Sequence, residues 1–319
     1  MPAPLFRKQG MTKYIIRRFL GLIPTLLIIM SLSFFIIRVA PGGPFARERS
    51  IPKLVLRNIL KKYHLDEPVW KQYGRYMLDV VRGDLGPSYR YHDRDVNYFM
   101  AQALPDSMVL GLMSLTLAVV FGIGTGIISA TRQNTWADYT SMAVAIVGVS
   151  IPLFVVGPIL MYFFALRWKW FPTSGWFMAD ASWKTAVMPV ITLTLPYFAY
   201  IARLSRASIL EVLRSDYVRT AQAKGLRPAV VMFKHILKGA LLPVVSYLGP
   251  AFANIVTGSI VVESIFRVPG LGNVFIQSAQ NRDYTMIMGT VIVYSVILLL
   301  MNFVVDILYG VLDPRISYR

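Results

Sequence analysis

Cysteine, histidine and charged residues are all scarce in this chain of 319 residues. It has no Cys, so it can form no disulfide, thiolate metal site or iron–sulfur cluster of its own, and its redox compartment cannot be inferred. Only 15% of its residues are charged, against about 25% in average soluble domains, while 55% are hydrophobic. This composition excludes an ordinary soluble domain and a disordered chain. It also disfavours a nucleic-acid binder, because the basic residues lie beside long apolar runs.

Motifs for nucleotide chemistry and catalysis are missing as well. There is no GxxxxGK[ST] and no Gly-Lys dipeptide, so the chain has no P-loop. It also lacks HExxH and GxSxG. Ser150, in Gly-Val-Ser, resembles the nucleophile of intramembrane serine proteases, but none of the three histidines lies in an apolar run to act as its base. We therefore expect no enzyme activity, metal site or cofactor in this chain.

Six long runs without Asp, Glu, Lys or Arg are present instead. They cover residues 19–37, 107–131, 139–166, 185–202, 239–262 and 284–305. A helix needs about 20 residues to cross the roughly 30 Å hydrocarbon core of a bilayer. The runs therefore predict an all-α integral membrane protein with six transmembrane helices.

Details within the runs refine this prediction. The first run is too long for a signal-peptide core and is followed by no small-x-small cleavage site, so we expect it to stay as a span. The fourth run is short and contains Pro189 and Pro196, which neighbouring helices can tolerate in a membrane. In the second run, Gly122 and Gly126 predict a close helix–helix contact.

The distribution of basic residues predicts the orientation. Sixteen Lys and Arg residues lie in the N-terminal tail 1–18, the loop 203–238, the C-terminal tail 306–319 and at Arg132. The two short loops on the opposite side carry five. The loop 38–106 carries twelve, but loops beyond about 60 residues cross largely regardless of charge. We therefore expect both termini in the cytoplasm, and much of the net charge of +17 to be a topology signal.

The long loop 38–106 is patterned as an ordered cap on the outer face. Apolar residues recur in it at helical spacing, first Leu54, Leu56, Ile59 and Leu60, then Val69, Tyr73, Tyr76 and Val80. Turn residues at 41–44 and 83–87 punctuate it. A packed lid without a ligand and a surface for a soluble partner both fit this pattern.

The loop 203–238 predicts a basic helix–turn–helix beneath the membrane. Its apolar residues form two stripes, Ile209, Leu213, Tyr217 and Ala221, then Leu226, Val230, Phe233 and Leu237. Gly225 suits a helix stop, and Pro228 suits the first turn of the next helix. The periodicity alone fits either an interfacial helix held by anionic membrane lipid or a docking knob for a cytoplasmic protein. The slim turn formed by Ala221, Ala223 and Gly225 favours docking.

Residues 211–226, EVLRSDYVRTAQAKGL, resemble the signature loop of inner-membrane permease subunits of ABC importers, in the peptide (oligopeptide and dipeptide) branch. The likeness continues through HILKGALLP at 235–243, VESIF at 262–266, PGLG at 269–272, RDY at 282–284, VDILY at 305–309 and DPRI at 313–316. Arg17, Arg18 and Pro24, with APGGPF at 40–45, resemble the B subunits of oligopeptide permeases in particular. Arg219-Thr220-Ala221 stands where the wider family has Glu-Ala-Ala, a departure that suits the peptide branch.

This resemblance implies a type I ABC importer permease, one half of an ATP-driven pathway for oligopeptides or dipeptides across the cytoplasmic (inner) membrane. Such a permease pairs with a second, homologous permease, two ATPase subunits that bind ATP and Mg, and a soluble substrate-binding protein. The coupling helix that docks on the ATPase would then be formed by Arg219, Thr220, Ala221, Lys224, Gly225 and Leu226.

Other transport functions remain open at this point. Related permeases for nickel, an opine or an antimicrobial peptide fit the sequence equally well. A proton-coupled secondary transporter fits less well, because buried carboxylates and histidines are few and no inverted repeat is visible.

Polar residues in or near the spans are the candidates for the substrate pathway. Asn254 lies in the middle of the fifth run, where an interhelical hydrogen bond is the alternative role. Glu263, at the outer end of that run, could meet a peptide ammonium group or could lie at headgroup level. Asp306 ends the sixth run near basic residues and predicts a structural ion pair.

The expected organisation is a cytoplasmic tail 1–18, a first span 19–37, an outer cap 38–106 and a transmembrane permease domain 107–305. The permease domain contains the coupling loop 203–238, and the chain ends in a cytoplasmic tail 306–319.

Overall fold

The computed structural model describes residues 5–39, 43–45, 52–91, 93–178, 182–258 and 260–312. This part of the chain is helical and contains no strand, only one isolated antiparallel bridge between Pro87 and Asp95. The all-α prediction is confirmed. Residues 1–4, residues 41 and 42 of the predicted turn at 41–44, and the tail from residue 313 onward, with its DPRI segment, lie outside the described residues.

Four helices are long and apolar enough to cross a membrane unbroken. They are α1 (Leu5–Val39), α4 (Val96–Thr131), α7 (Lys184–Leu213) and α14 (Tyr284–Leu312). Two more candidate spans are bent pairs of helices, Trp136–Ser150 with Leu153–Arg167, and Pro228–Ala240 with Leu242–Val256. Counting each bent pair as one span gives the six that the sequence predicts.

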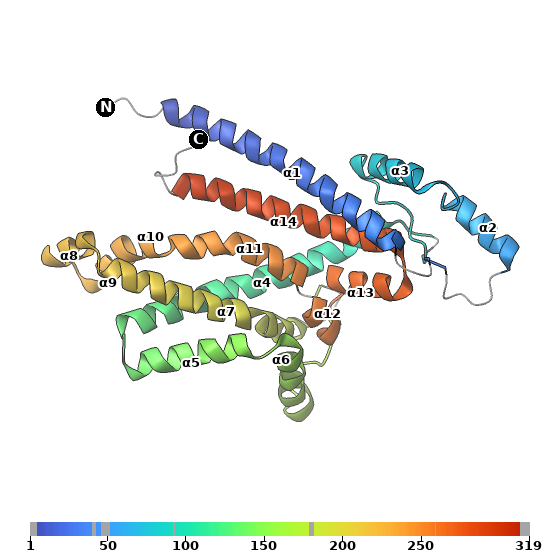
Figure 1. Cartoon of the computed structure of the whole chain (residues 1–319). Helices are drawn as coiled ribbons and strands as arrows, with labels where there is room; N and C mark the ends of the chain where they lie inside the picture. The colour runs from blue at the N-terminus through green and yellow to red at the C-terminus, as the bar shows by residue number, and fades with distance from the viewer. Residues whose placement is uncertain are drawn as a thin grey trace.

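The third predicted span, 139–166, is not a straight helix. α5 (Trp136–Ser150) and the segment Leu153–Arg167, which comprises α6 (Leu153–Leu160) and the π-helical η1 (Met161–Arg167), meet at 104°. Figure 1 shows α6 leaving the bundle at a steep angle. A residue that precedes proline is biased away from helical conformation, and Ile151, before Pro152, is extended with ψ 121°. Pro152 therefore turns the chain, so the third predicted span is a bent pair of helices.

α4 and α7 are longer than the apolar runs that predicted them. α7 continues to Leu213, well beyond residue 202, and α4 begins at Val96 instead of at 107. Charged residues end an apolar run but do not end a helix that leaves the membrane. The 30 residues of α7 span about 45 Å, against a hydrocarbon core of about 30 Å. Pro189 and Pro196 lie inside α7 without ending it.

The fifth predicted span, 239–262, is divided. The helical segment that contains α10 (Leu237–Ala240) meets α11 (Leu242–Gly258) at an angle of 53°. A separate short helix, α12 (Ile260–Phe266), follows, and Ser259 between the two lies outside the described residues. α13 (Leu271–Asn281) then leads into α14.

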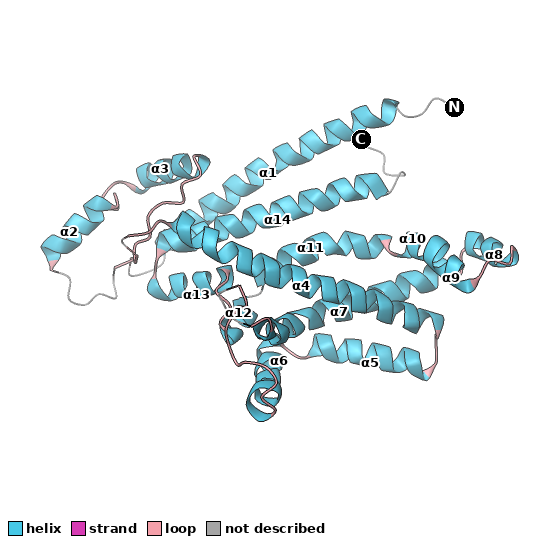
Figure 2. Ribbon diagram, turned by 180° about the vertical axis from the view of Figure 1, so that it is seen from behind, coloured by secondary structure: helices cyan, strands magenta, loops and turns pink. Residues whose placement is uncertain are grey.

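The two ends of the bundle carry different structures. Figures 1 and 2 show the beginning of α1, the end of α14 and α8 (Asp216–Ala223) at one end, and the cap helices α2 (Lys53–Lys62) and α3 (Val69–Val81) at the other. At the first end Arg18 and Asp306 lie 3.2 Å apart, which confirms the predicted ion pair. The cap is ordered as predicted, since Tyr76 of α3 packs with Phe34 of α1 and Met288 of α14.

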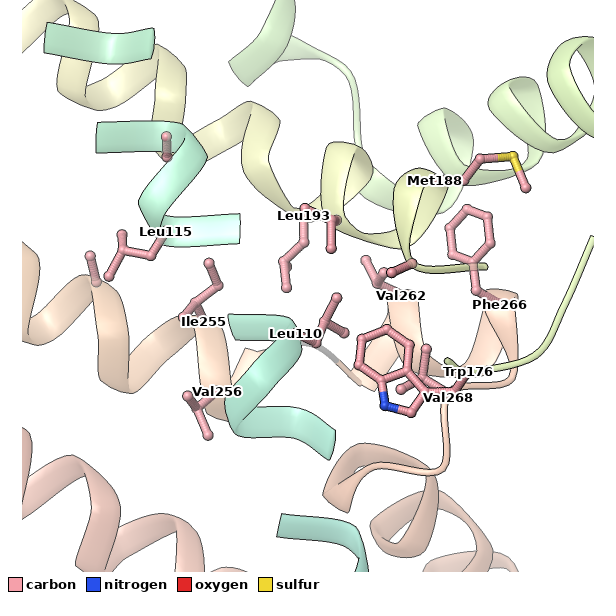
Figure 3. Close-up of a cluster of buried hydrophobic side chains, with 14 of the residues drawn as sticks. Leu110, Leu115, Trp176, Met188, Leu193, Ile255, Val256, Val262, Phe266 and Val268 are labelled. Atoms are coloured by element: carbon pink, nitrogen blue, oxygen red, sulfur yellow. The ribbon is translucent and has the colours of Figure 1, made fainter. Parts of the chain in front are cut away.

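The main core lies where α4, α7, α11 and α12 meet. Figure 3 shows Leu110, Leu193, Ile255 and Phe266 pointing into it. Further along α4, a Cβ added at Gly126 would lie 2.5 Å from the Ser205 side chain of α7, and one at Gly122 would meet Ile201 at 2.8 Å. The predicted close contact at these two glycines is confirmed.

Candidate functional site

Residues 214–238, which follow α7 and lead back towards the bundle, form a compact knob at its end. α7 ends at Leu213, and α8 starts after Ser215, whose extended backbone (ψ 149°) resets the helical phase. α8 ends at Ala223, and Gly225 in the turn that follows has φ +72° and donates its N–H to the Gln222 carbonyl at 2.9 Å. α9 (Pro228–Val230) then begins with proline, as predicted.

Gly225 occupies a backbone conformation that side chains disfavour. The left-handed region is readily available to Gly and strained for most other residues. Apart from its two neighbours in the chain, no atom of the described residues lies within 4 Å of a Cβ added at Gly225, so the position is sterically open on the outside. The turn therefore favours glycine at this position, and its open side is available for close approach by another molecule.

The inner face of α8 packs on the returning segment. Val218 is fully buried and Ala221 is 5% exposed, and both contact a cluster that includes Ile209, Val231 and Ile236. Positions i and i+3 share one side of a helix, so these two residues anchor the knob. The sequence places Ala221 both on the first apolar stripe and in the docking turn, and in the structure its side chain points inward.

The predicted apolar stripes are also rearranged. Because the phase is reset at Ser215, Tyr217 is exposed and Val218 takes the buried position instead. In the second stripe, Leu237 is buried, whereas Leu226, Val230 and Phe233 are exposed. The knob therefore carries apolar side chains on its outer surface.

The outer surface of the knob is basic. Arg219 and Thr220 of α8 are exposed, and so are Lys224, Gly225 and Leu226 in the turn that follows it. Arg219 pairs with Asp216 at 3.7 Å, and both side chains stay largely in solvent. The other exposed cations are Arg214, Arg227, Lys234 and Lys238. With Glu211 and Asp216 as the exposed acids of this loop, the surface suits an acidic partner.

A buried ion pair joins the helices that support the knob. Arg206 of α7 donates two hydrogen bonds, each 2.7 Å long, to the two carboxylate oxygens of Asp138 in α5. Ser129 of α4 also donates to Asp138, as does the Asn134 N–H at 3.0 Å. Asp138 is 2% exposed, so its charge is stable there only with these partners.

Sequence reasoning missed this pair. It placed Arg206 among the topology-determining cations of a loop, whereas α7 carries Arg206 within the bundle. The signal that was available is the single acid next to the start of the third apolar run.

The two predicted substrate-path residues, Glu263 and Asn254, lie in different environments. Glu263 of α12 is fully buried; one carboxylate oxygen accepts from Ser107 of α4 at 2.7 Å, and the other accepts from the N–H groups of Gly272 (2.8 Å) and Asn273 (3.3 Å). The expectation that Glu263 lies at headgroup level or meets a peptide is therefore corrected. It is an anchor between α4, α12 and the first turn of α13. Asn254 is exposed on α11.

No group of three His, Asp or Glu side chains in the described part of the chain is placed to hold a metal ion. The geometry thus describes a helical bundle with an exposed, basic, partly apolar knob, supported by a buried ion pair.

Comparison with known families decides which kind of bundle this is. The family model described as "Binding-protein-dependent transport system inner membrane component" matches residues 122–318, and the model for the N-terminal part of such membrane components matches residues 11–91. The chain belongs to this family. It is therefore a multi-pass permease component of an inner membrane.

Individual relatives of this permease cover nearly its full length. The oligopeptide transport system permease protein OppB of Salmonella typhimurium is 47% identical over 97% of this chain and 100% of its own length. The dipeptide transport system permease protein DppB of Bacillus subtilis is 43% identical over 96% of this chain and 98% of its own.

A solved structure shows the same fold. A chain of the MetNI methionine ABC transporter, in an inward-facing conformation, superposes with a TM-score of 0.55 at 20% identity, covering 68% of this permease and 97% of that chain. The type I ABC permease architecture expected from the sequence is confirmed.

Proposed function

We propose that this permease forms half of the pathway of an ATP-driven importer for oligopeptides or dipeptides, with both termini in the cytoplasm. The relatives named for oligopeptide and dipeptide transport support the substrate class. The partners in the proposal are a second, homologous permease, two ATPase subunits that hold ATP and Mg, and a soluble substrate-binding protein.

The observation that carries the proposal is the knob around Gly225. Its inner face is fixed by Val218 and Ala221, while its outer face presents Lys224, an open glycine backbone and Leu226. A segment that is fixed on its inner face and exposed on its outer face suits a docking surface through which a partner can move the helices. We assign Arg219, Thr220, Lys224, Gly225 and Leu226 to the ATPase contact, and Ala221 to the anchoring of the knob.

The buried ion pair gives the knob a connection to the spans. The knob follows directly on α7, and Arg206 of α7 holds α5 and, through Ser129, α4. A displacement of the knob is therefore transmitted to three helices together. It changes the state of the pathway only if the ATPase binds the two states with different affinity, since equal binding shifts no equilibrium.

The exposed position of Asn254 on α11 leaves it as the remaining candidate for a pathway residue or for a contact with the second permease. Glu263 is not retained as a candidate, because its carboxylate is already satisfied.

Purification from the native membrane with mild detergent tests the proposal. We expect two ATPase chains and a second permease to accompany this chain, and a Lys224→Glu, Arg219→Glu variant to lose the ATPases while keeping the permease partner. An Arg132→Glu variant, exposed outside the knob, is the matched control and keeps both. A stable homo-oligomer with proton-driven uptake and no ATPase would instead support a secondary transporter.

A further inference from the structure

One helix of the cap, α3, lies alongside the membrane-spanning part of α1. Tyr73 of α3 shares a 2.7 Å hydrogen bond with Ser31 of α1, and its ring stacks on Phe35 with the ring centres 5.4 Å apart. Tyr76, one turn further along α3, packs on the buried ring of Phe34. Figures 1 and 2 show α3 beside the end of α1 that carries the cap. These side chains hold α3 directly against a span.

The residues of α1 that contact α3 lie at membrane depth. The uncharged run 19–37 is about 28 Å long as a helix, so all of it is needed to cross a hydrocarbon core of about 30 Å. Arg38 ends this run, and its guanidinium donates to the Gln72 side chain of α3 at 2.9 and 3.1 Å. Ser31 precedes Arg38 by seven residues, or about 10 Å along the helix. Gln72 therefore lies at the boundary of the core, and Tyr73 reaches below it.

α3 also carries an apolar stripe that no described part of the chain covers. Trp70, Leu78 and Val81 are 68%, 60% and 80% exposed. A helix turns about 100° per residue, so these three positions fall within an arc of about 80°. Gly74, which is exposed as well, lies between them in the same arc. The stripe is therefore one continuous surface along α3.

The order of surfaces around α3 is typical of a helix that lies at a membrane surface. From the stripe, one direction round the helix leads to the two tyrosines that contact α1. The other direction leads to the charged residues of α3 and its C-cap, which are Lys71, Arg82, Arg75 and Asp79. An interfacial helix places an apolar side in lipid and a charged side in water. The apolar and charged sides of α3 match these two environments.

We propose that α3 lies in the lipid–water interface of the bilayer on the cap side, with Trp70, Leu78 and Val81 in contact with lipid. The apolar surface of the α1 span continues into this stripe, because Phe35 is 47% exposed beside Tyr73. A soluble protein has no access to apolar side chains at this depth, whereas lipid surrounds them.

The first residues of α3 suit this position as well. Trp is enriched where the hydrocarbon core meets the headgroups, because its ring is apolar and its N–H is polar. Lys71 places its Nζ atom 5.4 Å from the centre of the Trp70 ring, and a lysine stem can follow an apolar surface while its charge stays in water. The two neighbours therefore span the interface from lipid to water.

Spin labels on single cysteines test this placement, since the natural chain has no cysteine. Leu78→Cys and Val81→Cys put a label on the stripe, and Arg82→Cys, the next residue in the chain, is the matched control on the charged side. The labelled full chain is studied in lipid nanodiscs with the subunits that accompany it. Oxygen concentrates in lipid and a neutral nickel chelate in water. We expect oxygen to relax the labels at 78 and 81 more strongly than the chelate does, and the reverse at 82.

Two results would overturn the proposal. Stronger relaxation by the nickel chelate at 78 and 81 would show that the stripe faces water. Weak relaxation by both agents would show that protein covers the stripe, either the second permease or a soluble partner. All three substitutions are at exposed positions, so we expect the variants to keep the melting temperature of the unsubstituted chain.

Fluorescence quenching gives an independent measurement of lipid contact. With bimane on the same cysteines, phospholipids that carry a nitroxide on the acyl chain should quench the fluorophore at Val81→Cys more than at Arg82→Cys. Equal quenching at these two neighbouring positions would contradict an oriented helix in the interface. Neither measurement depends on transport, on its substrate, or on which side of the membrane the cap occupies.

Discussion

Asp138 holds three helices at the point where the knob joins the bundle. Its two oxygens accept from Arg206 of α7, Ser129 of α4 and the Asn134 backbone. The pair matters for the stability of the fold mainly because a single unpaired charge at this buried position would destabilise it. Removing one partner of a buried ion pair typically destabilises a protein by about 3–5 kcal/mol, whereas replacing both with apolar residues can be nearly neutral.

Substitutions at this pair should separate stability from coupling. Asp138→Ala strands the Arg206 charge and should lower the melting temperature in nanodiscs by several degrees. The double variant Asp138→Leu, Arg206→Met should recover most of that loss. If rigid linkage of α5 to α7 transmits movement of the knob, ATP-driven uptake stays low even in the double variant. A single Asp138→Ala variant with wild-type melting temperature and uptake would show that the pair has no such role.

The contacts of Glu263 could not be predicted from the sequence around it. Glu263, read as an outward carboxylate at a helix end, is wholly enclosed, because the chain folds back after α12 and brings the N–H groups of α13 to it. That contact depends on Gly270 and Gly272, where an added Cβ would lie 2.5 and 2.9 Å from Glu263 atoms. No periodicity within one helix carries this information. By contrast, the Arg18–Asp306 ion pair was predictable from charges at two span ends on one side.

At the scale of the element, the knob combines a fixed base with an open tip. The buried side of α8 is set by Val218 and Ala221, and the turn is set by Gly225 at φ +72°. The stop at Gly225 and the start at Pro228 were predictable, since each follows from a backbone property of one residue. The burial of Val218 in place of Tyr217 was not, because the four-residue spacing from Ile209 ignores the break at Ser215.

The variant Gly225→Asp tests whether the turn of the knob is the ATPase contact. Asp tolerates the left-handed conformation better than most residues, and no atom of the chain obstructs it, so we expect the variant to fold and reach the membrane. Its side chain and negative charge should prevent close approach of the partner surface. ATP hydrolysis by the complex should then be uncoupled from uptake.

Gly225→Asn is the matched uncharged control. It should show an intermediate loss of uptake, because it keeps the bulk and removes the charge. Normal peptide uptake by Gly225→Asp would contradict the assignment of this turn to the ATPase contact.

The sequence predicted the number of transmembrane helices but not where each helix ends or bends. Runs without charge gave the number of crossings, because burial in lipid excludes charges from the middle of every span. They did not give helix ends, since α4 and α7 extend beyond the lipid, where charge is no longer excluded. They did not give the 104° bend either, although Pro152 marks its place.

In the molecule as a whole, the two ends of the bundle carry different structures. The knob, the start of α1 and the end of α14 share one end, while the cap lies at the other (Figure 1). Basic residues predict that the first end faces the cytoplasm.

The absence of cysteine makes this orientation easy to test. Single Lys224→Cys and Arg82→Cys variants introduce exposed thiols at opposite ends of the bundle. In intact spheroplasts, a membrane-impermeant thiol reagent should label Arg82→Cys at once and Lys224→Cys only after permeabilisation. The reverse pattern would remove the basis for placing the ATPase contact at the knob.

We propose that this permease gates a pathway and that nucleotide hydrolysis on other chains drives it. Reconstitution into sealed vesicles tests it most directly, by measuring accumulation of a labelled peptide with ATP supplied on the side of the knob. We expect accumulation above the outside concentration only when ATPase, second permease and binding protein are all present. Uphill accumulation by this polypeptide alone would show that it needs no ATPase.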